Sequence, residues 1–144
     1  MAMRVLPLTL PSTSPLWDRA EVVGTVWSNE LDEISGIAID PDQPDFIWAH
    51  NDSGDRPRVF LLDTEGGLQA EVRLEKTSPY DAEDLTIGPC EPGEIKRCLF
   101  LADIGDNRHV RNFVVISRIP LPRSLTPRPK SLVVDHNMVL AYPD

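Results

Sequence analysis

Two short segments of this sequence place carboxylates and a glycine at the same spacing. The pattern Asp-x-Gly-Asp occupies residues 52–55 and recurs 51 positions later, at residues 103–106. A further acidic stretch, Asp81-Ala82-Glu83-Asp84, lies between them. Carboxylates gathered in one place repel each other unless they are protonated or share a cation. Oxygen ligands on flexible loops suit Ca2+, which binds about six to eight of them, so these segments predict a calcium site.

The expected site combines acidic, amide, imidazole and guanidinium groups from several parts of the chain. The expected metal ligands are Asp52, Asp55, Asp81, Glu83, Asp84, Asp103, Asp106 and Asn107. The residues expected to bind a further ligand are Glu33, His50, Asn51, Arg58 and Arg108. Arginines that follow the two turns either hold an anion bridged by calcium or neutralise neighbouring aspartates. The alternative for the whole set is that Asp, Asn and Gly serve only as turn residues, because their side chains bond to local backbone.

The segments that carry these residues lie between short runs of strand length. The runs are rich in β-branched and aromatic residues, and Pro, Gly, Asp and Asn bound them. None shows a helical apolar stripe of useful length, and 14 prolines among 144 residues disfavour long helices. The sequence therefore predicts an all-β chain. The predicted strands are Val22–Trp27, Ser35–Asp40, Phe46–His50, Arg58–Asp63, Leu68–Leu74, Leu85–Gly88, Cys98–Ala102, Phe113–Ile119 and Leu132–Ala141.

The order of strands and acidic turns is the same around both Asp-x-Gly-Asp patterns. A unit of four strands that recurs at about 40–50 residues is typical of a β-propeller blade. We therefore expect antiparallel four-stranded blades, blade one at about residues 31–78 and blade two at about residues 79–141. Within a partial propeller at residues 21–144, residues 21–28 are expected to be the closing strand of a missing blade. Residues 1–20 are expected to be a poorly structured leader.

Two blades leave sheet faces and edges open, because propellers typically have about four to eight blades. We expect a fragment of a longer propeller, with Tyr142-Pro143-Asp144 at the start of a third unit. The partners that follow from this expectation are the remaining propeller blades, or other copies of the chain bound through the open blade faces.

The blade geometry predicts where the acidic groups meet. In an antiparallel blade, the turn between the second and third strands lies at the same end as the connection into the first strand, because strand direction alternates. The eight carboxylates expected at this end are Glu33, Asp52, Asp55, Asp81, Glu83, Asp84, Asp103 and Asp106. Gly54 and Gly105 are expected to supply the backbone freedom that brings the turns around one point.

Cys90 and Cys98 are the two cysteines of the chain, and they flank a stretch of turn composition, residues 91–94. They either face each other across a hairpin and form a disulfide, or are two unrelated buried thiols. A disulfide implies an oxidising compartment. Prolines interrupt the apolar stretch of residues 1–10 and no cleavage site follows, so a signal peptide either lies upstream or is absent. We expect a periplasmic or extracellular location if it lies upstream, and the sequence predicts no location otherwise.

The charge balance excludes several classes of partner. The chain has 14 Lys and Arg against 23 Asp and Glu, a formal net charge of −9, and no basic cluster. Nucleic-acid binding requires concentrated positive charge, so we expect no nucleic-acid partner. No run of residues approaches the roughly 18 apolar residues that a spanning helix requires, so we expect no membrane insertion.

In combination, these motifs resemble those of a largely uncharacterised family of bacterial, mostly exported β-propeller proteins. The resemblance covers about residues 21–144 and implies a propeller longer than this chain. Ala82 departs from the family pattern, in which an aromatic residue is usual at this position. The motifs that carry the resemblance are Glu33-Ile34-Ser35-Gly36, His50-Asn51-Asp52-Ser53-Gly54-Asp55, Ala82-Glu83-Asp84-Leu85 and Ala102-Asp103-Ile104-Gly105-Asp106-Asn107. A looser similarity to β-propeller phytases, calcium-dependent phosphoesterases with acidic channels, rests on architecture and acidity alone.

Three functional interpretations follow from these features. We favour a binding or scaffold module that Ca2+ stabilises at its acidic loop face. The alternative is a calcium-dependent hydrolase of phosphoesters or other esters, in which Asp and Glu hold a metal-activated water and arginine orients the substrate. The third interpretation is a non-functional product of a truncated gene.

Overall fold

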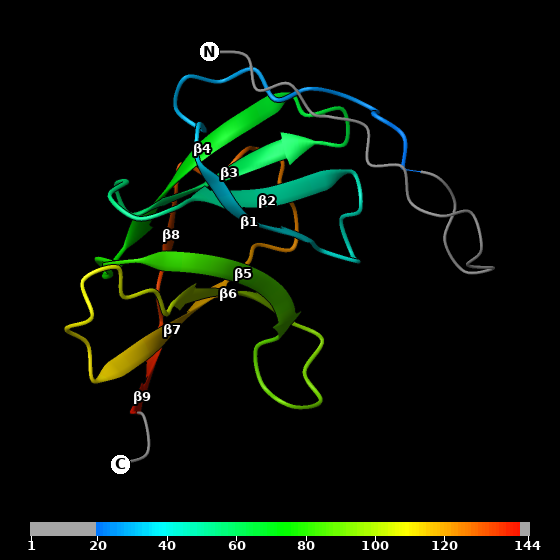
Figure 1. The fold of residues 1–144 in the computed structure, drawn as a ribbon. Coiled ribbons are helices and arrows are strands. Elements are labelled where there is room, and N and C mark those ends of the chain that lie inside the picture. Colours follow the sequence, from blue (N-terminus) through cyan, green and yellow to red (C-terminus); the bar gives the residue numbers. More distant parts are fainter. Residues whose placement is uncertain (1–19, 142–144) are drawn as a thin grey trace, which may run out of the picture.

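The computed structural model describes residues 20–141, whose regular elements are all β-strands (Figure 1). The strands are β1 (Ile34–Ile39), β2 (Phe46–Asn51), β3 (Arg58–Asp63), β4 (Leu68–Glu75), β5 (Ala82–Pro89), β6 (Arg97–Asp103), β7 (Phe113–Pro120), β8 (Ser131–Val133) and β9 (His136–Ala141). The predicted all-β class is confirmed, and residues 20–141 contain no helix. The predicted leader, apart from Ala20, and the predicted start of a third unit at Tyr142 lie outside the described residues.

The strands form two sheets, one above the other in the view of Figure 1. The first sheet has the order β1-β2-β3-β4-β8 and the second sheet has the order β5-β6-β7-β9. Neighbouring strands are antiparallel in both sheets, except that β8 pairs with β4 in parallel. Each predicted repeat therefore supplies one antiparallel run of four strands, and β8 extends the first.

The prediction of Leu132–Ala141 as one strand is wrong, because the chain changes sheets within this segment and forms β8 and then β9. The N–H of Val134 donates to the carbonyl oxygen of Glu75 in β4 at 3.0 Å. The N–H of the next residue, Asp135, donates to the carbonyl oxygen of Arg118 in β7 at 3.1 Å. Consecutive residues thus bond to different sheets, and this segment ties the two sheets together.

The prediction of Val22–Trp27 as a strand is also wrong, since residues 20–33 form no strand. This segment covers the face of the first sheet that points away from the second sheet. Its residues Val26 and Leu31 belong to a small hydrophobic cluster with Phe60 and other residues of that face. The segment packs on a sheet face rather than beside an edge strand. It therefore does not form the backbone hydrogen bonds that define a strand.

The main hydrophobic core lies between the two sheets. The fully buried side chains of Trp48 and Leu61 in the first sheet share one cluster with Leu99 and Ile119 of the second sheet. Burying one such side chain stabilises the fold by about 1.5–3 kcal/mol. This core holds the sheets face to face and so places the loops at their ends next to each other.

The two sheets carry the same irregularity near the start of their first strands. Both β1 and β5 contain a β-bulge, and the extra residues are Ser35 in β1 and Glu83 in β5. The pairs on either side of the bulges are Ile34–Asn51 and Gly36–His50 in the first sheet, and Ala82–Asp103 and Asp84–Ala102 in the second. A bulge marks a definite position in a strand. Matching the bulge of β1 to that of β5 therefore gives each residue of the first sheet an equivalent residue in the second. Asn51 is then equivalent to Asp103, one position away from the alignment of the Asp-x-Gly-Asp patterns.

The strands β1 and β5 approach each other closely at Gly36. A Cβ atom built at this glycine would lie 2.6 Å from Nε2 of His50 and 2.9 Å from the backbone nitrogen of Leu85. Non-bonded heavy atoms prefer separations of about 3.5–4.0 Å. A larger residue at Gly36 would therefore force the two sheets apart at this end.

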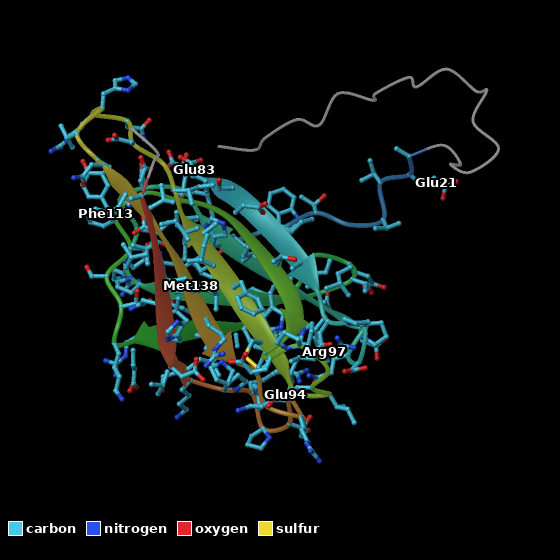
Figure 2. The ribbon with its side chains drawn as sticks, turned by 90° about the horizontal axis from the view of Figure 1, so that it is seen from below. Glu21, Glu83, Glu94, Arg97, Phe113 and Met138 are labelled. Atoms are coloured by element: carbon cyan, nitrogen blue, oxygen red, sulfur yellow. A yellow bond between two sulfur atoms is a disulfide. The ribbon has the colours of Figure 1, made fainter. Side chains whose placement is uncertain are left out.

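Cys90 and Cys98 form a disulfide, the first of the two expected alternatives. It closes the turn between β5 and β6, at the end of the second sheet opposite to Glu83 (Figure 2). The disulfide thus braces the end of the sheet away from the acidic loops.

Candidate functional site

The acidic end of the molecule is built from the segments that enter β1 and β5 and the loops that follow β2 and β6. In the first sheet, Oδ1 of Asn51 accepts the backbone N–H of Glu33 at 3.3 Å. In the second sheet, Oδ1 of Asp103 accepts the backbone N–H of Asp81 at 2.8 Å. These hydrogen bonds occupy equivalent positions in the two sheets, and each holds an entering segment against a loop.

Three carboxylates at this end, those of Asp52, Asp81 and Glu83, form what we term the acidic triad. Asp52 follows β2 of the first sheet, whereas Asp81 and Glu83 lie at the start of β5 in the second sheet. One oxygen from each of the three lies within 4.8 Å of those of the other two. Two oxygens on opposite sides of one Ca2+ ion lie about 5 Å apart, because each Ca–O distance is about 2.3–2.6 Å. The spacing therefore fits one ion shared by the two sheets.

Asp81 is the most firmly held member of the acidic triad and is only 1% exposed. Its Oδ2 accepts the backbone N–H of Asn107 at 3.0 Å, and its Oδ1 accepts the side-chain amide of Asn107 at 3.3 Å. A carboxylate offers about four lone-pair sites, so acceptor capacity remains. A Cβ atom at Gly105 would lie 2.5 Å from Cγ of Asp81. Gly105 is thus required for space, whereas Gly54 has a positive φ of 88° and is required for its backbone conformation.

Cationic side chains balance the charge of the acidic triad only in part, through the electrostatic attraction between Asp81 and Arg111, which itself pairs with Asp103. Within residues 20–141, no ion pair joins Asp52, Asp81 or Glu83 to a lysine or arginine. Burial raises the pKa of Glu83, and the negative charges of Asp52 and Asp81 raise it further. Mutual repulsion of this kind favours either a proton or a bound cation.

Asp55, in the loop after β2, is neutralised within its own turn. Arg58 is 8% exposed, and its Nε donates to Asp55 at 2.8 Å while its Nη1 lies 2.7 Å from a carboxylate oxygen of Glu30. Asn51 donates its side-chain amide to Asp55 at 3.0 Å. Burial raises the pKa of Asp55, but hydrogen bonds from Arg58 and from the backbone N–H of Arg56 outweigh it and hold this pKa below its usual value.

Asp103 and Asp106, in the loop after β6, are also satisfied locally. Nη1 of Arg111 lies 2.7 Å from Oδ1 of Asp103, and both side chains are 9% exposed. Asp106 accepts the backbone N–H groups of Val110 and Arg111 at 3.0 and 2.8 Å. These two hydrogen bonds lower the pKa of Asp106. Arg58 and Arg111 thus pair with aspartates, as one of the two expected arrangements has it, whereas Arg56 pairs with Glu30 and Glu71.

The remaining predicted site residues have other positions. Glu33 and Asp84 are exposed; Glu33 contributes backbone groups, and Oδ1 of Asp84 accepts the N–H of Leu85 at 2.8 Å. Arg108 is exposed in the loop after β6, and Asn107 orients Asp81. The structure therefore gathers three of the eight expected carboxylates into one group.

His50 lies buried behind the acidic end and is 2% exposed. Its Nδ1 lies 2.6 Å from the carbonyl oxygen of Asn51, which can only accept, so Nδ1 donates and Nε2 is left as an acceptor. Nε2 has no hydrogen-bond partner within the described residues. Burial lowers the pKa of His50 and outweighs the opposite effects of the Asn51 carbonyl and the charges of Asp84 and Asp52.

Glu30 belongs to the acidic end of the molecule, although the sequence pattern did not reveal it. It binds Arg58 and Arg56, at 2.7 and 3.1 Å, and so completes the ion pairs around the first acidic turn. These ion pairs lower the pKa of Glu30. No local motif marks this residue, because its partners follow 26 and 28 positions later in the chain.

The comparisons with known proteins identify no relative of this chain. No protein-family model matches it, and neither a curated protein nor a solved structure matches it. Within residues 20–141, no helix has the length and apolar character needed to cross a membrane. The function is therefore inferred from the arrangement of the residues themselves.

Proposed function

We propose that this chain is a β-propeller-type binding or scaffold module in which Ca2+ links two sheets at their acidic end. The acidic triad carries this proposal, because its oxygens come from both sheets and lie within 4.8 Å of one another. A cation bound between Asp52, Asp81 and Glu83 would neutralise their repulsion. It would also join the loop after β2 to the start of β5.

The chemistry of the donors favours Ca2+ over a transition metal. The triad offers carboxylate oxygens, whereas zinc and copper sites draw on histidine and cysteine. Asp81 is pre-positioned by Asn107 and keeps free acceptor capacity. Asp52 and Glu83 are partly exposed, so water has access to the remaining ligand positions. Ca2+ tolerates such a mixed and flexible set of oxygen ligands.

The arrangement of the arginines favours binding over hydrolysis. A calcium-dependent hydrolase of the expected kind needs an arginine that is free to orient an anionic substrate. Arg58 is occupied by Asp55 and Glu30, and Arg111 is occupied by Asp103. Both guanidinium groups thus serve the local structure, and within the described residues only the exposed Arg108 among the predicted ligand-binding arginines has no ion pair. We therefore propose binding rather than hydrolysis.

Two further observations support the propeller architecture and the cellular compartment in this proposal. Equivalent bulges in β1 and β5 and antiparallel runs of four strands are what repeated propeller blades would contain. The Cys90–Cys98 disulfide supports an oxidising compartment, the periplasm or the extracellular space.

Thermal unfolding followed by circular dichroism tests the proposal, first with EDTA and then with Ca2+. A ligand that binds only the native state raises the unfolding free energy by about 2.7 kcal/mol at a concentration of about 100 Kd. Asp52→Asn and Asp81→Asn should each remove most of the shift. Glu33→Gln is the matched control, since Glu33 stands at the position of the first sheet that is equivalent to Asp81. A cooperative transition that Ca2+ does not move in the unmodified chain would overturn the proposal.

A further inference from the structure

The outer face of the second sheet, which points away from the first sheet, carries an apolar patch beside the paired residues Arg118 and His136. In β7, Ser117 and Ile119 are buried on the side of the first sheet, so the alternate residue Ile116 points outward. The apolar residues of this outer face are Phe100, Ala102, Val114, Ile116, Met138 and Leu140. None of them belongs to a hydrophobic cluster of the described residues. Figure 2 looks onto this side of the molecule, with Met138 in front of the strands.

These side chains form one continuous surface across β6, β7 and β9. Ala102 pairs with Ile116, and Ile116 pairs in turn with Met138. Val114 pairs with Leu140, which is 53% exposed. Directly opposed residues on one face of a sheet lie about 4.5–5.5 Å apart, so the apolar side chains adjoin each other.

The internal repeat indicates which kind of surface fits the outer face. The bulge alignment makes Phe100 equivalent to Trp48 and Ala102 equivalent to His50. In the first sheet, Trp48 is fully buried against the second sheet, in one cluster with Leu99. The outer face of the second sheet therefore corresponds to the inner face of the first sheet. That inner face is already packed against a sheet within the chain.

The inner face of the second sheet, which carries Leu99 and Leu101, corresponds to the outer face of the first sheet, which points away from the second sheet. The same alignment makes Leu99 equivalent to Ile47 and Leu101 equivalent to Ala49. Ile47 and Ala49 belong to the small cluster that residues 20–31 cover. The covering segment also exposes large apolar side chains, those of Val22, Val23 and Trp27, which are 75–77% exposed.

We propose that copies of this chain associate head to tail. The outer face of the second sheet in one copy packs against residues 20–31 and the far side of the first sheet in the next copy. This contact continues between chains the stacking that joins the two sheets within one chain. Because the two contact surfaces differ, the association is heterologous and generates a ring or an open series of copies. The inference is independent of calcium binding.

Charge sets the conditions under which the association is strongest. Each copy carries a formal net charge of −9, so copies repel each other at low ionic strength. Salt screens this repulsion, with a Debye length of about 10 Å at 0.1 M and about 3 Å at 1 M. Association through apolar faces should therefore strengthen as the salt concentration rises.

Sedimentation velocity of the full chain at rising protein concentration, in low and in high salt, tests the proposal. We expect the mean mass to rise with concentration, and more so in high salt. Ile116→Lys, on the outer face, and Trp27→Lys, on the covering segment, should each yield monomers. Ile95→Lys is the matched control, because Ile95 is 87% exposed in the disulfide-closed turn, and it should associate like the unmodified chain. Circular dichroism checks that each variant is folded, and Met138→Gln replaces Ile116→Lys if that variant unfolds.

Mixing the two interface variants distinguishes head-to-tail contact from other modes. Each variant keeps one intact surface, so an equimolar mixture should form a dimer and nothing larger. Failure of the mixture to associate would overturn the proposal, and so would association of either variant alone, because that would point to contact of one face with itself. An unmodified chain that stays monomeric at every concentration and salt level would overturn it as well.

Discussion

The two acidic turns of this molecule meet the same structural need with different residues. At the end of β2, Asn51 accepts the backbone N–H of Glu33 and donates its amide to Asp55, which binds Arg58. At the end of β6, Asp103 alone accepts the N–H of Asp81 and binds Arg111. Asp103 is charged, so it can bind both the backbone N–H and the arginine. Asn51 is neutral, so a second carboxylate, that of Asp55, binds the arginine in the first sheet.

This difference determines which carboxylates remain without a cationic partner. The buried arginines take Asp55 and Asp103, and backbone N–H groups take Asp106. Asp52 is left free beside the start of β5, where Asp81 and Glu83 stand in the positions that Glu33 and Ser35 occupy in the first sheet. The acidic triad thus arises from the different residues that the two sheets carry at equivalent positions.

Exchanging the two strand-end residues should have the largest effect on stability. Asp103→Asn leaves Arg111 buried without its charged partner, and removing one member of a buried ion pair typically costs about 3–5 kcal/mol. Asn51→Asp places a second carboxylate 3.0 Å from Asp55 and removes a donor, which should cost about 1–3 kcal/mol. Urea denaturation measures both. Asp84→Asn, at an exposed position, is the control and should stay within about 0.5 kcal/mol. If neither Asp103→Asn nor Asn51→Asp changes the free energy of unfolding, the residues at the two strand ends are interchangeable.

The calcium effect should depend on pH through Glu83. The pKa of Glu83 is raised in the folded state, so protonation stabilises the metal-free fold at low pH, and this contribution is lost as the pH rises through that pKa. Ca2+ must displace the proton, and its stabilisation, about 2.7 kcal/mol at roughly 100 Kd, should shrink on acidification. Glu83→Gln should weaken calcium binding at neutral pH and flatten its pH dependence. Thermal unfolding at several pH values with and without Ca2+ measures this, and a calcium shift that is constant down to pH 4 would contradict it.

Two aspartates of the matching Asp-x-Gly-Asp patterns should respond in opposite ways when Ca2+ is absent. Asp106→Ala removes the acceptor of two backbone N–H groups and should lower the free energy of unfolding. Asp52→Asn relieves repulsion with Asp81 and Glu83 and should leave the free energy of unfolding unchanged or raise it. Chemical denaturation in EDTA compares the two. Equal losses would show that the hydrogen bond from the backbone N–H of Ser53 to Asp52 matters more than the repulsion within the acidic triad.

The smallest expected effect is the pH response of His50. Its folded-state pKa lies below the ordinary value of 6.5, so the unfolded chain binds the proton more readily. Stability should therefore fall as the pH drops from 6.5 through the folded-state pKa. His50→Gln should reduce this slope, whereas His136→Gln, at an exposed position of β9, should not. Identical slopes in the unmodified chain and in His50→Gln would refute the assignment.

The sequence by itself determined the features that depend on neighbours in the chain. Alternating apolar runs and turn residues predicted an all-β chain, and the runs at Phe46–His50 and Arg58–Asp63 correspond to β2 and β3. The repeated order of strands and turns correctly placed Asp52, Asp81 and Glu83 at one end. Periodicity and turn chemistry are local properties, so one sequence suffices to predict them.

Only the tertiary structure decided how the acidic side chains are shared and where two segments lie. Arg58 meets Glu30 from 28 positions away, and Asp52 meets Glu83 only because the core brings the two sheets together. The sheet change at Val134 and the packing of residues 20–31 on a sheet face depend on which partner offers free backbone or apolar surface. Such competition between distant partners leaves no local pattern, which is why eight carboxylates were expected around one point and three lie close together in the acidic triad.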